Sequence, residues 1–72
     1  MFILIQDKSE ILNGKRSDYI YAYRDYVRMR IPDYTNSADL GKYRSAERAK
    51  EVLNEIFNAR KAGQSGFEMP EE

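Results

Sequence analysis

The sequence contains neither cysteine nor histidine. Without cysteine the chain forms no disulfide bond and has no thiol nucleophile. Without histidine it lacks the commonest neutral metal ligand, so a nucleophile and its base would have to come from Ser, Thr, Lys, Asp or Glu. We find no set of such residues at a spacing typical of a catalytic or metal site. We therefore expect a protein that is not an enzyme, with no catalytic residues, no metal and no cofactor.

Net charge and long apolar runs are also missing. Lysine plus arginine and aspartate plus glutamate number twelve each, so the formal net charge is zero. Because binding to long nucleic acid normally needs a net basic surface, we do not expect that partner. No apolar run approaches the ~20 residues of a membrane span. The apolar start, residues 1–5, lacks the basic region and cleavage site of a signal peptide. We expect a cytoplasmic protein that does not bind membranes.

The length of 72 residues predicts a single domain, residues 1–72. A chain this short buries only about 60% of its unfolded surface, so its core is marginal. Disulfides, metals and self-association are the usual reinforcements of small domains. Since the composition disfavours the first two, we predict a homo-oligomer.

Three segments outside the centre of the chain predict strands. Residues 2–6 are apolar on both faces, which is typical of a central strand or of one covered by a second subunit. Residues 11–12 begin a short second strand, and Asn13-Gly14 is a strong turn signal. Residues 33–39 are predicted to be a polar loop, and residues 40–43 a short final strand.

Residues 46–61 predict a helix, with Ser45 as the N-cap and Gly63 as the terminator. Its apolar stripe consists of Ala49, Val52, Leu53 and Ile56, with Phe57 widening it. Residues 64–72 are expected to be a flexible or strand-like tail whose last two residues fray. The fold class is therefore α+β: an antiparallel meander of four to five short strands with one C-terminal helix packed on one face.

The segment 18–31 is the most informative part of the chain, because it alternates with a period of two. A tight turn at Arg24-Asp25 makes it a hairpin with two different faces. The aliphatic face carries Ile20, Ala22, Val27, Met29 and Ile31. The other face, here called the Tyr–Arg face, carries Tyr19, Tyr21, Tyr23, Tyr26, Arg28 and Arg30.

The Tyr–Arg face has three interpretations. Tyrosine rings stack on bases and arginines bind phosphate, so the face suits a nucleotide. Tyrosine and arginine are also enriched at protein interfaces, so the face suits a partner protein or a second copy of the chain as well. Finally, both residue types suit a solvent-exposed sheet surface, where they favour strand pairing.

A second basic cluster surrounds the predicted start of the helix. Lys42, Arg44 and Arg48, with Lys50 nearby, lie where unpaired backbone N–H groups attract anions, which suggests a phosphate site. The alternative is a solvated helix shoulder whose cations pair with Glu47 and Glu51.

Three stretches carry a resemblance to known proteins: residues 3–7, residues 40–56 and the ending Met69-Pro-Glu-Glu72. In these the chain resembles small uncharacterised proteins of Gram-positive bacterial genomes and their phages. The resemblance implies a meander-plus-helix fold and a mobile-element setting, hence the host cytosol if the protein is phage-encoded. In that setting we expect stoichiometric binding to a host protein, interfering with that protein or with a defence pathway. The alternatives are sequestration of a signalling nucleotide and a purely structural oligomer.

Overall fold

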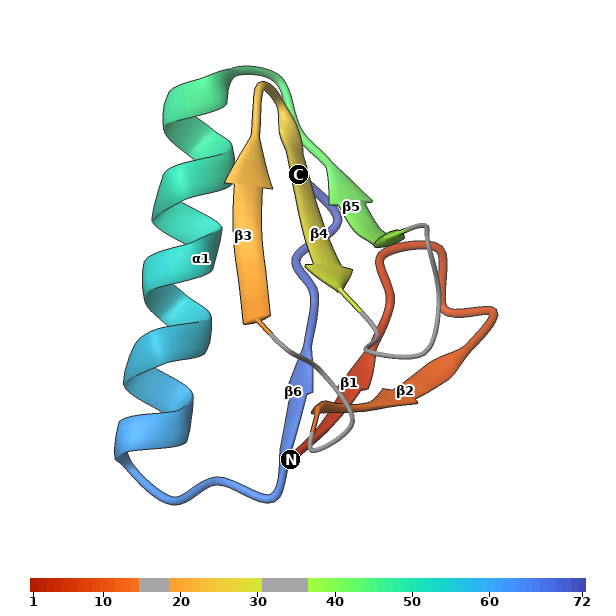
Figure 1. Cartoon of the computed structure of the whole chain (residues 1–72), viewed down its shortest axis with the longest axis vertical. Helices are drawn as coiled ribbons and strands as arrows, with labels where there is room; N and C mark the ends of the chain where they lie inside the picture. Colours follow the sequence, from red (N-terminus) through yellow and green to blue (C-terminus); the bar gives the residue numbers. More distant parts are fainter. Residues whose placement is uncertain (15–18, 31–36) are drawn as a thin grey trace.

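The computed structural model describes residues 1–14, 19–30 and 37–72, in which six strands and one helix occur (Figure 1). The strands form two three-stranded sheets, with orders β2-β1-β6 and β3-β4-β5. The elements are β1 (Phe2–Leu4), β2 (Ile11–Asn13), β3 (Tyr19–Tyr23), β4 (Tyr26–Arg30), β5 (Ser37–Lys42), α1 (Ala46–Lys61) and β6 (Gly66–Glu68). The predicted α+β class, a meander with one helix packed on it, is confirmed.

The β3-β4-β5 sheet is the antiparallel meander. Within it, Tyr19 pairs with Arg30, Tyr21 with Arg28 and Tyr23 with Tyr26, so the hairpin register predicted from the period of two is confirmed. Arg24 has a φ of 54°, the left-handed conformation that two-residue hairpin turns favour. The aliphatic side chains face α1, which contacts β3 and β4. Val27 and Met29 are fully buried there, and Ile31 lies outside the described residues.

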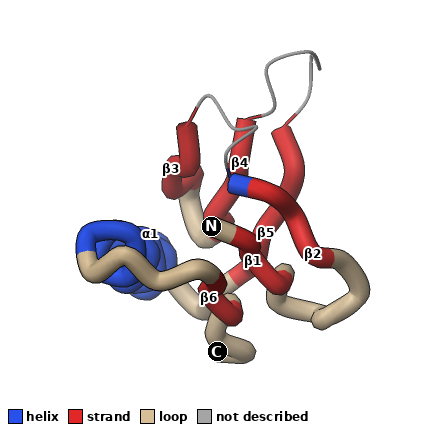
Figure 2. The backbone as a smooth tube through the Cα atoms, turned by 90° about the horizontal axis from the view of Figure 1, so that it is seen from below, coloured by secondary structure: helices blue, strands red, loops and turns tan. Residues whose placement is uncertain are grey.

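The second sheet was not predicted as a separate unit. Its central strand β1 is antiparallel to β2 and parallel to β6, with Phe2 opposite Gly66. The central position fits the apolar character of both faces of this strand. Figure 2 shows β3, β4 and β5 side by side, with β1 and β6 on one side of them and α1 beside β6 in this view. Parallel pairing of distant segments leaves no local signal in a sequence, which is why β6 was assigned no partner.

The strand β5 begins earlier than predicted. Residues 37–39 belong to it, so assigning them to the polar loop was wrong. Their partners are on β4, where Arg28 pairs with Asp39 and Arg30 with Ser37. Pairing along a formed strand outweighs the weak strand preference of serine and aspartate. The rest of the predicted loop, residues 33–36, lies outside the described residues.

The core collects side chains from both sheets and from the helix. The helix contributes Ala49, Val52 and Ile56 as predicted, and Leu53 is partly buried. Phe57 is 60% exposed, so the prediction that it widens the stripe was wrong, and Ala59 is buried instead. A helix turns 100° per residue, which carries position 57 beyond the sheet while position 59 returns to the stripe. The remaining core residues are Ile3, Val27, Met29, Leu40, Tyr43 and Met69.

Both helix caps are as predicted. The Oγ atom of Ser45 accepts a hydrogen bond from the backbone N–H of Arg48 at 3.0 Å, which satisfies one of the free donors of the first turn. Gly63 adopts a φ of 76° just after the helix, where an αL residue closes many helices.

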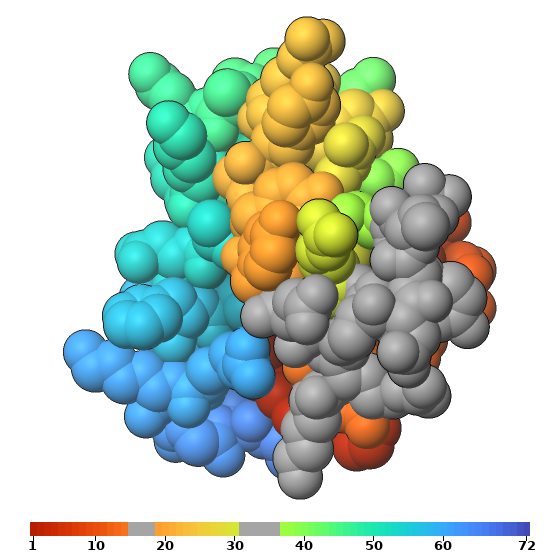
Figure 3. All heavy atoms as spheres, viewed as in Figure 1, coloured from red at the N-terminus to blue at the C-terminus, as the bar shows by residue number. Residues whose placement is uncertain are grey.

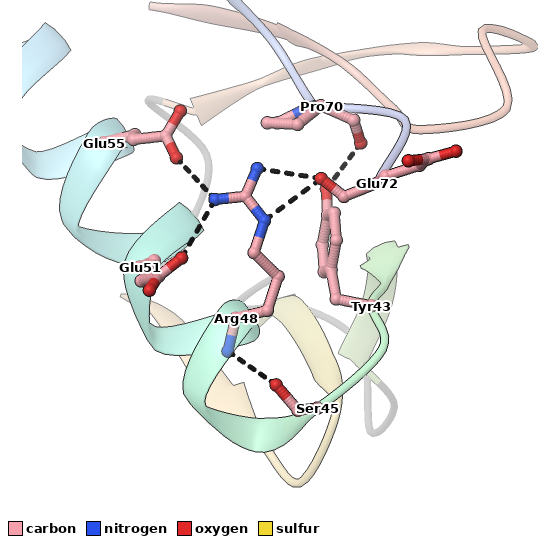
Figure 4. Close-up of polar contacts among 7 residues, drawn as sticks. All are labelled: Tyr43, Ser45, Arg48, Glu51, Glu55, Pro70 and Glu72. Atoms are coloured by element: carbon pink, nitrogen blue, oxygen red, sulfur yellow. Dashed lines mark hydrogen bonds and ion pairs between the residues drawn. The ribbon is translucent and has the colours of Figure 1, made fainter.

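The segment after β6 is contacted by side chains from three parts of the chain, and Figure 4 shows two of them, Tyr43 and Arg48. The Tyr43 hydroxyl donates to the main-chain oxygen of Pro70 at 2.9 Å. The Arg48 guanidinium donates to that of Glu72, and the Gln6 amide to that of Glu71. These donors contact the main-chain oxygens of the last two residues, and the fraying of those residues stays a prediction.

Candidate functional site

The Tyr–Arg face is built on β3 and β4 by strand alternation alone. Tyr19 and Tyr23 are about half exposed, at 50% and 46%. Arg30 is exposed, whereas Tyr21, Tyr26 and Arg28 are partly buried by their neighbours. The face therefore combines accessible rings at its margin with packed side chains at its centre.

Arg28 organises the centre of the face. Its Nε atom donates to Oδ1 of Asp39 on β5 at 2.8 Å, and its guanidinium carbon lies 5.0 Å from the Tyr23 ring centre and 4.9 Å from that of Tyr26. Burial acts to lower the pKa of Arg28, but the hydrogen bond and the charge of Asp39 outweigh it and leave the pKa raised. Arg28 is therefore a positively charged group in contact with the rings of Tyr23 and Tyr26.

Two further cations flank these rings. The Arg24 guanidinium lies 5.3 Å from the Tyr23 ring centre, and the Lys42 ammonium lies 5.7 Å from that of Tyr26. The result is a row of alternating cations and rings, here called the cation–ring row: Arg24, Tyr23, Arg28, Tyr26 and Lys42. Asp39 is ion-paired with Arg28, so two of the three cations of the row have no such carboxylate beside them among the described residues.

The other end of the face is aromatic. The rings of Tyr19 and Tyr21 are 5.1 Å apart and tilted by 49°, a favourable geometry for two aromatic side chains. The Tyr21 hydroxyl shares a 2.6 Å hydrogen bond with the hydroxyl of Ser37 on β5. The hydrogen bond to Ser37 therefore holds Tyr21 in place independently of its ring contact with Tyr19.

The predicted phosphate cluster is not brought together. Lys42 lies over Tyr26, Arg44 is exposed in the connection to α1, and Arg48 faces the chain after β6. The Arg48 Nη1 atom is 3.3 Å from Glu51 and 3.0 Å from Glu55, while Nε and Nη2 donate to Glu72 (Figure 4). Phosphate binding by these residues stays a prediction, and Arg48 is already engaged by the fold.

Sequence reasoning missed two members of the site. Asp39 was assigned to a loop and Arg24 to a turn, yet both contact the Tyr–Arg face. A signal for Asp39 exists, because a third strand paired with β4 places an acidic residue opposite Arg28. Recognising it requires the β4–β5 register, which includes an irregularity between Val27 and Arg28.

Comparison of this chain with family models, with curated proteins and with solved structures finds no match to any of them. The resemblance to phage-encoded proteins therefore stays a prediction. Of the helical residues that the structure describes, no stretch combines the length and the apolar character needed to cross a membrane.

Proposed function

We propose that this protein acts by stoichiometric binding to another protein through its Tyr–Arg face, with a host protein as the partner in the phage setting that the resemblance implies. The cation–ring row carries this proposal. Contacts between its rings and cations restrict these side chains within the folded chain, which reduces the side-chain entropy lost on binding. Tyrosine and arginine are also the residue types that contribute most energy at protein interfaces.

The chemistry of the row indicates the kind of partner. Arg24 and Lys42 remain without a carboxylate partner among the described residues, so the complementary surface carries aspartate or glutamate beside an apolar patch. A nucleotide fits the row less well. The hollow beside Tyr26, Asp39 and Lys42 measures about 180 Å³, below the ~300–1,000 Å³ typical of small-molecule sites.

The test is affinity capture followed by reconstitution with the purified partner. Tyr23→Ala combined with Arg24→Ala removes accessible atoms of the row and leaves the core untouched. The control is Ile11→Ala on β2, which removes an even more accessible apolar side chain, 67% exposed against 46% for Tyr23. We expect the double variant to bind the identified partner at least about ten-fold more weakly, since interface anchors contribute 2 kcal/mol or more. Equal capture of every protein by the parent and the double variant contradicts the proposal.

The predicted homo-oligomer is a separate proposal about the same chain. Light scattering at micromolar concentration gives the mass, and a value of one chain contradicts self-association. If the parent is oligomeric and the Tyr23→Ala, Arg24→Ala variant is monomeric, the Tyr–Arg face is the subunit interface. The structural-oligomer alternative then replaces binding to a host protein.

A further inference from the structure

A groove of about 590 Å³ lies at the surface where the strand β3 packs against the helix α1. Figure 3 shows β3 in orange meeting α1 in cyan and blue at the surface. The strand contributes Tyr19 and Ile20, and the helix contributes Leu53 and Ile56 to the apolar part of the lining. The volume lies within the range of ~300–1,000 Å³ that small-molecule sites occupy.

Among the described residues that line the groove, the charged side chains are all positive. Lys50 and Arg60 are the cations, and none of these lining residues is an aspartate or glutamate. Neither cation forms an ion pair among the described residues. The nearby helix carboxylates Glu51 and Glu55 are turned instead toward Arg48. The groove is therefore complementary to an anion.

Two aromatic residues line the groove, and the ring of one of them, Tyr19, also packs against the ring of Tyr21. Phe57 from the helix is 60% exposed and Tyr19 from the strand is 50% exposed, although both line the groove. The ammonium group of Lys61 lies 5.9 Å from the Phe57 ring centre and adds positive charge beside it. Exposed rings gathered beside unpaired cations are a platform for a flat anionic ligand, because bases stack on aromatic side chains.

Helical spacing sets the order of these groups. Asn54, Phe57 and Arg60 are three residues apart, so they follow one another along one side of α1 at about 4.5 Å intervals. An amide, a ring and a guanidinium group in that order match the base edge, the base plane and the phosphate of a nucleotide. An acidic peptide uses the cations but gains nothing specific from the rings.

From the charge, the rings and the volume together, we propose that the β3–α1 groove binds a nucleoside phosphate, with its base against Tyr19 and Phe57 and its phosphate on Arg60. This site shares Tyr19 with the Tyr–Arg face but is otherwise distinct from it, since Asn54, Phe57 and Arg60 belong to the helix. The inference does not rest on the proposed protein-binding function, and either stands if the other fails.

Isothermal calorimetry with the full chain tests the proposal. The probes are ATP, GTP and AMP, with adenosine, inorganic tripolyphosphate and a poly-glutamate peptide as separate arms. We expect at least one nucleotide to bind at least about ten-fold more tightly than adenosine or tripolyphosphate, because stacking and ion pairing then act together. No heat with any nucleotide at millimolar concentration overturns the proposal, and so does tighter binding of the peptide.

Three variants locate the binding. Arg60→Gln removes the charge and Phe57→Leu the ring, and each is expected to weaken binding about ten-fold or more. Asn54→Asp adds a carboxylate to the groove and is expected to abolish binding. These side chains are exposed or lie outside the core, and circular dichroism confirms folding. Asn58→Asp, which changes an exposed helix asparagine that does not line the groove, is the matched control for Asn54→Asp and should bind like the parent. Nucleotide binding that survives Arg60→Gln and Asn54→Asp unchanged overturns the proposal.

Discussion

Tyr43 is the residue whose chemistry the fold constrains most. It is 4% exposed, its hydroxyl donates to the Pro70 oxygen, and its backbone N–H donates to the Asp25 oxygen at 2.7 Å. Burial raises the pKa of Tyr43 to about 12, the charge of Arg48 opposes this rise, and that of Glu55 adds to it. Through its backbone and its phenol together, Tyr43 therefore connects the end of β5, the β3–β4 turn and the chain after β6.

The raised pKa of Tyr43 predicts a loss of stability in alkali. In the unfolded chain the phenol releases its proton near its ordinary pKa of 10, whereas the folded protein keeps it to about 12. Stability from the neutral phenol is thus complete below pH 10 and is lost as the pH rises from 10 to 12. The change Tyr43→Phe should lower the free energy of unfolding at pH 7 by about 1–2 kcal/mol, since the Pro70 oxygen loses its donor.

Urea denaturation of the parent and Tyr43→Phe at pH 7, 10 and 11 checks this prediction. The difference between the two proteins should shrink above pH 10, because the variant has no phenol to titrate at this position. A difference that stays constant to pH 11 contradicts the assigned pKa.

Gly41 makes room for the Tyr43 ring. A Cβ atom at position 41 meets the Tyr43 hydroxyl oxygen at 2.7 Å and Cε2 at 2.9 Å, and the ring is held in place by Pro70. We expect Gly41→Ala to lower the free energy of unfolding by about 1–3 kcal/mol through overpacking. Thermal denaturation measures it, with Gly66→Ala as the control, because a Cβ there lies 3.7 Å from its nearest neighbour. Equal melting temperatures for Gly41→Ala and Gly66→Ala would contradict the prediction that the Tyr43 ring is held in place.

At the scale of elements, the helix and the hairpin were predictable because their signals are local. Ser45 and Gly63 mark the ends of α1 within a few residues of the helix itself. The period of two in residues 19–30 fixes the β3–β4 register once the turn is placed. The environment of Phe57 was not predictable, since it depends on where the sheet ends rather than on the helix.

Arg48 connects the first turns of the helix to the end of the chain. We expect Arg48→Ala to lower the free energy of unfolding measurably, because it removes the donors to Glu72 and leaves Glu51 and Glu55 as unpaired neighbours. The change Arg48→Lys should retain only part of this stability, since an ammonium group does not reproduce the planar set of donors of a guanidinium group.

Urea denaturation at pH 7 measures the contribution of Arg48. All of its contacts with Glu51, Glu55 and Glu72 involve the charged guanidinium group, so the loss caused by Arg48→Ala should become smaller at high salt. Arg44→Ala, which changes an exposed arginine one turn away, is expected to stay within about 0.5 kcal/mol of the parent. If Arg44→Ala loses as much stability as Arg48→Ala, the effect comes from the loss of a positive charge and not from the contacts of Arg48.

At the scale of the whole molecule, Gln6 joins the two sheets. Its backbone N–H donates to the Leu40 oxygen at 2.9 Å, and its side-chain Oε1 accepts from the Lys42 N–H at 2.8 Å. Its Nε2 donates to the main-chain oxygens of Lys42 and Glu71. From the sequence alone, Gln6 was predicted only to belong to the first strand, because its hydrogen-bond partners are distant in the chain.

The change Gln6→Glu tests this junction. At pH 7 the new carboxylate has no donor and faces two carbonyl oxygens, so we expect a loss of about 1–3 kcal/mol. Protonation of the new group restores a donor, and the deficit should therefore diminish as the pH is lowered toward 4. Urea titrations at both pH values measure it, with Gln64→Glu as an exposed control. A Gln6→Glu protein as stable as the parent at pH 7 rules out the junction.

The parallel pairing of β1 with β6 has a consequence for synthesis on the ribosome. Phe2 lies opposite Gly66, and Met69, 1% exposed, packs into the core. A nascent chain that has emerged only as far as the helix has its hairpin and most of its apolar residues but lacks the strand and the methionine that complete the packing. Cooperative folding must therefore wait for the emergence of residues 66–69, and until then the flank of β1 that β6 will cover is open to chaperones or to other chains.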